Sequence, residues 1–177
     1  MCGLARNNRR SGSVPKAKKM RFRLDPTQRT DEEGRFAWIE EVAQGVMQEA
    51  VARGLDDESV YYLAAAVREA VLNALCHGRD PQGEPWVSVD VGRPRDGKLV
   101  VTVRDQGPGF DPTRVPDPRE PEQCHRPCGR GLFFMRRFTD GLSFHFPGPG
   151  GSRVTLEKRL PTNGTTDASV RRSRKKN

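Results

Sequence analysis

The chain has 177 residues, enough for one domain with a single hydrophobic core, and its formal net charge is +8. The positive charge lies at the ends: residues 1–23 contain eight Lys/Arg and no acid, and residues 161–177 contain five Lys/Arg against one acid. The segment between them is net acidic. Because basic, apolar-poor ends cannot join a core, we predict disordered basic tails at 1–19 and 161–177 and one folded domain at 20–160.

Composition also excludes several classes of protein. Residues 1–19 lack the apolar segment of a secretory signal, and no apolar run approaches the roughly 20 residues of a membrane helix. We therefore expect a cytoplasmic protein without a membrane partner. The cysteine positions do not favour a disulfide framework. Cys124, His125 and Cys128 are possible zinc ligands, but no second ligand pair follows them at a zinc-finger spacing, and we expect no metal there.

The first part of the chain predicts a strand and two helices. Apolar residues alternate with arginines at 20–24, which indicates a short strand. Apolar residues then recur at spacings of three and four over 31–53 and over 57–77, and a glycine follows each run, as is typical of a helix end. An aspartate at 56 or 57 can cap the second helix.

The second part predicts four strands and one more helix. Alternating valines at 87–91 and a more continuous apolar run at 98–104 indicate a hairpin, with the second strand buried. Residues 105–128 are rich in proline and lack periodicity, which indicates one long loop. A helix at 131–139 and a last hairpin at 142–160 follow. This order predicts an α+β fold, a two-layer sandwich with about three helices on one face of a mixed sheet.

Three polar residues follow one another at a spacing of four on the second predicted helix. Glu69, Asn73 and His77 lie within about 80° of one another around the helix axis, beside the apolar stripe that packs on the sheet. A carboxylate there can deprotonate a hydroxyl or a water, and an amide oxygen is a suitable ligand for Mg²⁺. Each residue alone is also compatible with an ordinary helix surface, and His77 with the helix dipole.

An aspartate and two glycines follow the predicted buried strand. Asp105 stands at the strand end, and Gly107 and Gly109 would bring the backbone close to a ligand. The carboxylate could accept a hydrogen bond from an exocyclic amine, the group that distinguishes adenine. A Gly-Pro turn with a capping aspartate is the alternative.

A second glycine segment opens the third predicted helix. Gly129, Arg130, Gly131 and Leu132 would place free N–H groups and the helix dipole at a phosphate. Arg130, or an arginine of the preceding loop at 119 or 126, could reach a terminal phosphate, although each can also be a solvated side chain.

In this order and these contexts, the motifs resemble the GHKL (histidine kinase-like) ATPase superfamily, and most closely its anti-sigma factor serine/threonine kinases. The segments "REAVLNALCHG", "VRDQGPGFDP" and "GRGLFFMRRFTDGL" resemble the N, G1 and G2 boxes of that family. The segment "GSRVTLEKRL" resembles its last strand, so that the resemblance covers about residues 20–160. It implies a Bergerat-type fold with ATP and Mg²⁺ as cofactors.

The resemblance also implies roles for single residues. Glu69 would be the catalytic base, Asn73 the Mg²⁺ ligand and Asp105 the adenine contact, and residues 111–128 would form the ATP lid. The other nucleotide contacts would come from Gly107, Gly109, Gly129, Arg130, Gly131 and Leu132. Members of this family phosphorylate an anti-anti-sigma (STAS-type) partner and otherwise hold a sigma factor inactive, commonly as homodimers.

Three alternatives stay open. A non-catalytic ATP-binding module that captures a protein partner would keep the same fold, but the presence of both Glu69 and Asn73 favours the kinase. The catalytic domain of a histidine kinase is less favoured, because no dimerisation helix with a phosphoacceptor histidine precedes the predicted fold. Binding of nucleic acid through the tails is not expected, because the domain is net acidic and has no recognisable reader motif.

Overall fold

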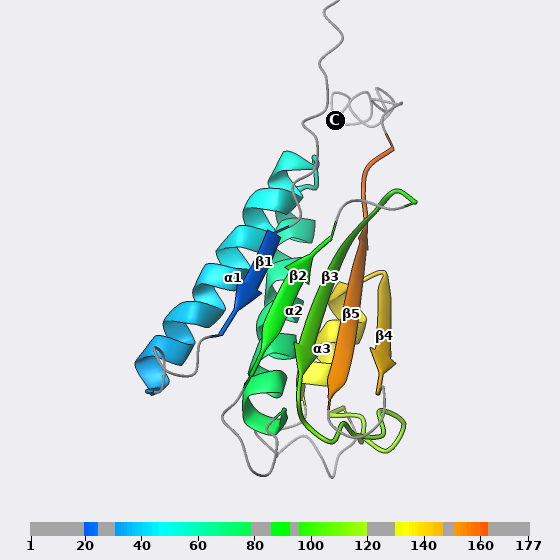
Figure 1. Cartoon of the computed structure of the whole chain (residues 1–177). Coiled ribbons are helices and arrows are strands. Elements are labelled where there is room, and N and C mark those ends of the chain that lie inside the picture. The colour runs from blue at the N-terminus through cyan, green and yellow to red at the C-terminus, as the bar shows by residue number, and fades with distance from the viewer. Residues whose placement is uncertain are drawn as a thin grey trace, which may run out of the picture.

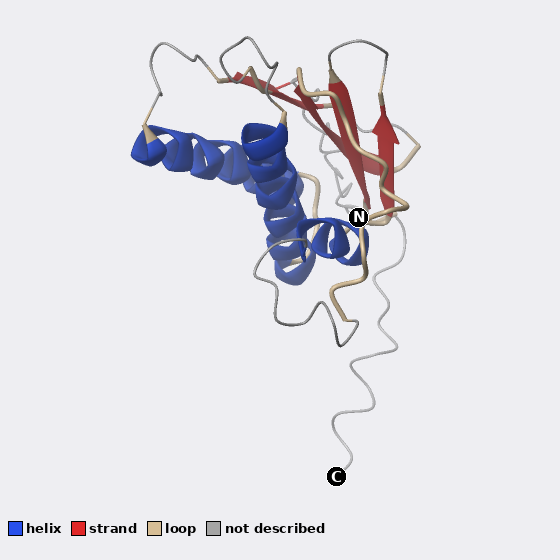
Figure 2. Cartoon of the chain, turned by 90° about the horizontal axis from the view of Figure 1, so that it is seen from below, coloured by secondary structure: helices blue, strands red, loops and turns tan. Residues whose placement is uncertain are grey.

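The computed structural model describes residues 20–24, 31–78, 86–92, 96–119, 130–146 and 151–162. The described strands are β1 (Met20–Arg23), β2 (Ser88–Val91), β3 (Lys98–Asp105), β4 (Gly141–His145) and β5 (Ser152–Arg159). The described helices are α1 (Glu32–Ala52), α2 (Asp57–His77) and α3 (Arg130–Phe138). The helices lie together on one face of the sheet, which confirms the predicted α+β sandwich (Figure 1, Figure 2). No helix within these ranges is both long enough and apolar enough to cross a bilayer.

Aspartate caps fix the starts of the two long helices. The side chain of Asp31 accepts a hydrogen bond from the backbone N–H of Gly34 at 2.9 Å, and the side chain of Asp56 accepts one from the backbone N–H of Ser59 at 2.7 Å. Each carboxylate satisfies one of the N–H groups that have no partner in the first turn and favourably faces the helix dipole. At the other end of α2, Gly78 is the C-cap, so that α2 ends where the sequence predicts.

The strands follow the order β1-β2-β3-β5-β4, and every neighbouring pair is antiparallel. The expectation of a mixed sheet is therefore corrected for the described strands. Two helices connect β1 to β2, so the chain returns to the end of the sheet where β1 stopped, and β2 runs back beside it. β4 does run parallel to β3, but β5 lies between them.

The hydrophobic core lies between the helices and the inner face of the sheet, and α2 is its central element. This helix contacts both other helices as well as β3 and β5. Along β3, Leu99, Val101 and Val103 are fully buried and alternate with half-buried residues. The strand is thus covered on one face, whereas the sequence predicts a more continuously buried strand. Asp105 is the last of the alternate residues of β3 that face the core, so its carboxylate lies at the edge of the core.

Candidate functional site

Glu69 and Asn73 of α2 lie against the first turn of α3. A Cβ atom at Gly131 would stand 2.8 Å from Oε2 of Glu69 and 3.2 Å from Nδ2 of Asn73. Glycine therefore leaves the space that both polar side chains occupy. The first backbone N–H groups of a helix have no partner within the helix, so this turn offers donors beside a carboxylate and an amide.

Glu69 and Asn73 have no fixed partner among the residues that the structure describes. Both Glu69 and Asn73 are half-buried, and neither side chain makes a hydrogen bond or an ion pair within the described part of the chain. Burial raises the pKa of the Glu69 carboxyl above its ordinary value, because the charged form loses hydration. A carboxylate with a raised pKa and free lone pairs is a better proton acceptor than an exposed one.

Asp105 occupies a different environment at the end of β3. Its side chain is buried, and both oxygens accept hydrogen bonds: Oδ2 from the hydroxyl of Ser152, and Oδ1 from the backbone N–H of Gly107 at 2.9 Å. These two bonds fix the orientation of the carboxylate. Each oxygen retains capacity for one more donor, so the group can still accept a hydrogen bond from a ligand.

Close backbone contacts join Asp105 to the end of α2. A Cβ atom at Gly78 would stand 2.4 Å from Cβ of Asp105, and one at Gly107 would stand 2.6 Å from the carbonyl oxygen of His77. The N–H of Gln106 donates to the carbonyl of Gly78 at 3.2 Å. The His77 side chain is exposed, so only its backbone takes part in this contact.

Gly109 completes the turn after Asp105. Its φ of +76° lies in the left-handed region, and a Cβ atom there would meet the ring of Phe146 at 2.4 Å. Both conditions require glycine. The turn that begins at Asp105 is therefore held by two glycines that have no room for a side chain.

α2 connects the two halves of the site. Gly78, next to Asp105, follows Glu69 by nine residues, which is about 14 Å along a helix axis. One end of this stretch presents a fixed buried acceptor, and the other presents a carboxylate, an amide and a helix N-terminus. The arrangement suits an elongated ligand that has a hydrogen-bond donor at one end and anionic groups at the other.

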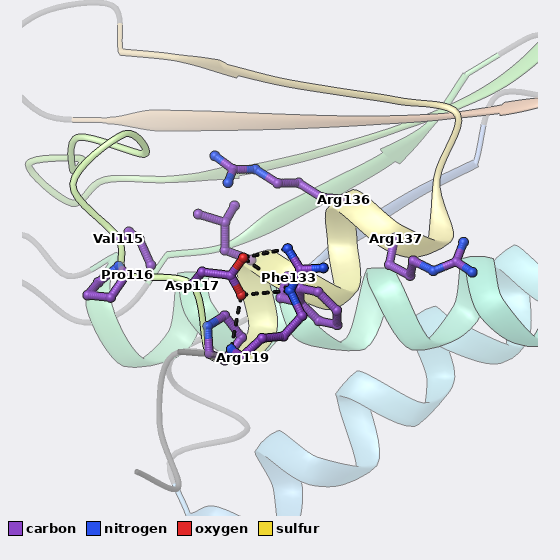
Figure 3. Close-up of a pocket in the computed structure, with 9 residues that line it drawn as sticks. Val115, Pro116, Asp117, Arg119, Phe133, Arg136 and Arg137 are labelled. Atoms are coloured by element: carbon purple, nitrogen blue, oxygen red, sulfur yellow. Dashed lines mark hydrogen bonds and ion pairs between the residues drawn. The ribbon is translucent and has the colours of Figure 1, made fainter. Parts of the chain in front are cut away.

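A cavity of about 270 Å³ lies between loop residues 115–119 and α3 (Figure 3). Arg119 pairs with Asp117 at 2.6 Å, and its guanidinium lies 5.3 Å from the ring centroid of Phe133 on α3. Hydrogen bonds from the Arg119 side chain and backbone lower the pKa of Asp117 to about 2. The first half of the predicted lid thus contacts α3 through a cation–π pair.

Some residues considered in the sequence lie outside the described residues. They are Gly129 of the predicted phosphate segment, the lid arginine Arg126, and Cys124, His125 and Cys128, where no metal is expected. Of the residues that follow them, Arg130 is exposed at the start of α3, and Leu132 is buried in the core. Only the backbone of Leu132 is therefore available to a ligand.

A magnesium ion would fit at Asn73 only together with ligand oxygens. The described part of the chain has no cluster of three or more His, Cys, Asp or Glu residues that could hold a metal. Mg²⁺ is commonly held by one or two protein ligands plus phosphate oxygens and water. The half-buried amide of Asn73 beside Glu69 and the first turn of α3 meets that requirement.

Sequence reasoning did not assign two residues to the site. Ser152 donates to Asp105 because β3 and β5 pair with these two residues opposite each other. Gly78 was expected as a helix end and as the last residue of the segment "REAVLNALCHG", but without a role at Asp105, for which it makes room. The serine lies inside the last predicted strand, and only the strand register could have placed it next to the carboxylate.

Comparison with known proteins agrees with this geometry. Residues 35–158 match the histidine kinase-like ATPase domain. Over 98 residues the chain is 31% identical to the anti-sigma F factor of Heyndrickxia coagulans, and the match covers 53% of this chain and 65% of that protein. It is 28% identical over 102 residues to the anti-sigma F factor of Priestia megaterium, covering 55% of this chain and 68% of that protein.

A solved structure supports the fold alone. The SiaB-SiaC complex from Pseudomonas aeruginosa contains a chain that matches with a TM-score of 0.51 and 16% identity, over 68% of this chain and 82% of that chain. The family match extends from α1 to β5 and includes both halves of the site, so it rests on more than half of the sequence. The chain belongs to the histidine kinase-like ATPase domain family.

Proposed function

We propose that the protein is a serine/threonine kinase of the anti-sigma factor type, which uses ATP and Mg²⁺. It phosphorylates an anti-anti-sigma (STAS-type) partner and binds a sigma factor, as a homodimer. Membership of an ATPase domain family supports ATP as the ligand, and the similarity to two anti-sigma F factors supports the regulatory role. The observation that carries the catalytic part is the approach of Gly131 to both Glu69 and Asn73.

In this proposal the nucleotide lies along the last turns of α2. The buried carboxylate of Asp105 accepts a hydrogen bond from the exocyclic amine of adenine. The hydrogen bonds that it accepts from Ser152 and Gly107 keep it oriented for that contact. The phosphates lie at the first turn of α3, where the N–H groups and the helix dipole favour negative charge. Gly131 allows this approach because a side chain there would collide with Glu69.

Glu69 is the group that removes the proton of the acceptor hydroxyl. The hydroxyl oxygen forms a bond to the γ-phosphorus, the bond between that phosphorus and ADP breaks, and the proton passes to the carboxylate of Glu69. The raised pKa of Glu69 suits this transfer, because a very weak base would not hold the proton. Asn73 holds the Mg²⁺, which when bound neutralises charge on the phosphates.

Replacing the proposed base separates catalysis from binding. Glu69→Gln keeps the size and the hydrogen-bonding capacity of the side chain but removes the proton acceptor, and loss of a general base typically costs about 10² to 10⁴ in rate. We expect transfer of radiolabelled phosphate to a STAS-type partner recovered by affinity capture to fall by that factor, with ATP affinity unchanged. Glu33→Gln, an exposed glutamate of α1, is the matched control and keeps the wild-type rate.

A negative result with the wild-type protein is equally informative. If it binds both ATP and the recovered partner but transfers no phosphate, the kinase proposal fails, and the protein is an ATP-dependent binding module instead.

A further inference from the structure

The outer face of the sheet carries a row of basic side chains. None of the described helices covers this face, since all three pack on the opposite one (Figure 2). The strand register places one residue of each strand side by side in this row: Arg23, Ser88, Arg104, Arg153 and His145. Neighbouring strands lie about 4.8 Å apart, so three arginines of this row, Arg23, Arg104 and Arg153, lie in line across the sheet, with the buried Ser88 between the first two.

The basic side chains of this face outnumber its acidic side chains. Among the described residues the face holds two acids, and both are occupied: Asp90 pairs with Arg21 and Arg104, and Glu157 pairs with Lys98. The remaining basic side chains of the face make no ion pair within the described ranges: Arg23, Arg153 and Arg159. The Nε atom of Arg153 is also buried without a hydrogen-bond partner there.

Both basic ends of the chain connect to the same end of this sheet. β1 begins at Met20, opposite Val91, and β5 ends at Arg159, opposite Lys98, and these positions lie toward one end of the strands (Figure 1). The segment before residue 20 carries six Lys/Arg and the segment after residue 162 carries five. In the sequence, two basic segments are therefore joined to strands that contribute to this face.

We propose that this outer face binds the phosphodiester backbone of nucleic acid. Phosphate backbones are contacted by Arg, Lys, Ser and Thr side chains, and the face presents these types, including the hydroxyls of Thr102, Thr155 and Ser143. A protein partner would require an apolar centre, but Val100 is the one large apolar side chain among the described residues of this face. A second copy of the same face would bring like charges together.

This proposal goes beyond the kinase function and departs from the expectation drawn from composition. The net charge of the domain is negative, and net charge alone argues against binding of nucleic acid. The register shows an uneven distribution of this charge, because the outer face holds more Lys and Arg than the two acids that pair there, and most of the described acids lie elsewhere. Backbone contacts of this kind need no reader motif and give binding that does not depend on base sequence.

The test measures the full chain against a labelled duplex DNA of about 25 base pairs, and against a single strand of the same length, by fluorescence anisotropy at about 50 to 200 mM salt. We expect binding that weakens steeply with salt. The triple variant Arg23→Gln/Arg153→Gln/Arg159→Gln should lose at least tenfold in affinity for the preferred probe, and the slope against log salt should fall by roughly two to three. Arg137→Gln, which removes an exposed arginine from α3, should change affinity by less than twofold.

The variants also guard against unfolding. Arg23 and Arg159 are exposed, so the double variant Arg23→Gln/Arg159→Gln should keep the wild-type melting temperature and ATP affinity while losing part of the DNA affinity. Three results would overturn the proposal: no binding of either strand form by the wild-type chain at the lowest salt, equal binding and salt slope in the triple variant and the wild type, or tighter binding to a poly-glutamate peptide than to DNA.

Discussion

Glu69 and Asp105 are the two carboxylates of the candidate site, and their environments are opposite. Glu69 is half-buried beside Gly131, has no described partner, and has a raised pKa. Asp105 is buried, accepts hydrogen bonds from Ser152 and from the backbone of residue 107, and packs against Gly78. The difference explains how one site can hold two acids with different functions: a group without fixed donors can take up a proton, whereas a group held by donors is a rigid acceptor.

The packing around Asp105 should be sensitive to a single methyl group. In Gly78→Ala the new Cβ would stand 2.3 Å from the carbonyl oxygen of Ala74 and 2.4 Å from Cβ of Asp105, and neither atom is the end of a flexible side chain. We expect a loss of about 1–3 kcal/mol in the free energy of unfolding, together with weaker ATP binding. Gly97→Ala, where no atom lies within 4 Å of the new Cβ but φ is +70°, should cost about 1 kcal/mol and leave ATP affinity unchanged. Wild-type stability and wild-type ATP affinity in Gly78→Ala, measured by chemical denaturation and calorimetry, would show that the packing around Gly78 tolerates a methyl group.

The hydrogen bond from Ser152 should contribute less. Ser152→Ala leaves Oδ2 of the buried Asp105 without its donor, and we expect a loss of about 1 kcal/mol or somewhat more in the free energy of unfolding. Ser143→Ala, which changes an exposed serine on neighbouring β4, serves as the control and should be nearly neutral. Urea denaturation of both variants measures the difference. A urea midpoint of Ser152→Ala equal to that of the wild type would mean that the hydrogen bond from Ser152 does not fix the carboxylate of Asp105.

The smallest expected effect concerns Glu69 and pH. The folded-state pKa of Glu69 lies above its ordinary value, so the folded protein loses stability as pH rises from the ordinary glutamate value through the raised one. Glu69→Gln removes this cost, and we expect a small rise in melting temperature at pH 7 that vanishes at pH values well below the ordinary pKa of glutamate. Glu33→Gln should show no such gain, because an acid in the first turn of α1 is favourable to the helix. A fall in melting temperature of Glu69→Gln at pH 7 would mean that the carboxylate has a stabilising partner.

Local signals made the helices and strands predictable. Apolar spacing located the two long helices, and the aspartates before α1 and α2 act as caps, as Asp56 shows by its bond to Ser59. Alternation located the strands. These features depend on residues that are close in sequence, where the chemistry of caps and turns decides the outcome.

Long-range pairing could not be predicted in the same way. The position of β5 between β3 and β4, and hence the antiparallel sheet, depends on contacts between distant segments. The same pairing places Ser152 beside Asp105 and aligns Arg23 with Arg104 across β2. Motif spacing did indicate Glu69 and Asn73, but their approach to Gly131 requires the packing of α3 on α2.

The assignment of Asp105 to nucleotide binding and of Glu69 to catalysis is tested most directly by measurement of ATP affinity. Calorimetry of Mg-ATP binding to the wild type, Asp105→Asn and Glu69→Gln compares both groups in one experiment. We expect Asp105→Asn to weaken binding by at least tenfold, or about 1.4 kcal/mol, because the amine of adenine loses a charged acceptor. Glu69→Gln should bind within about twofold of the wild type, because Asn73 and the first turn of α3 still hold the phosphates. Unchanged affinity in Asp105→Asn, or an equal loss in both variants, would contradict the assignment of one carboxylate to binding and the other to catalysis.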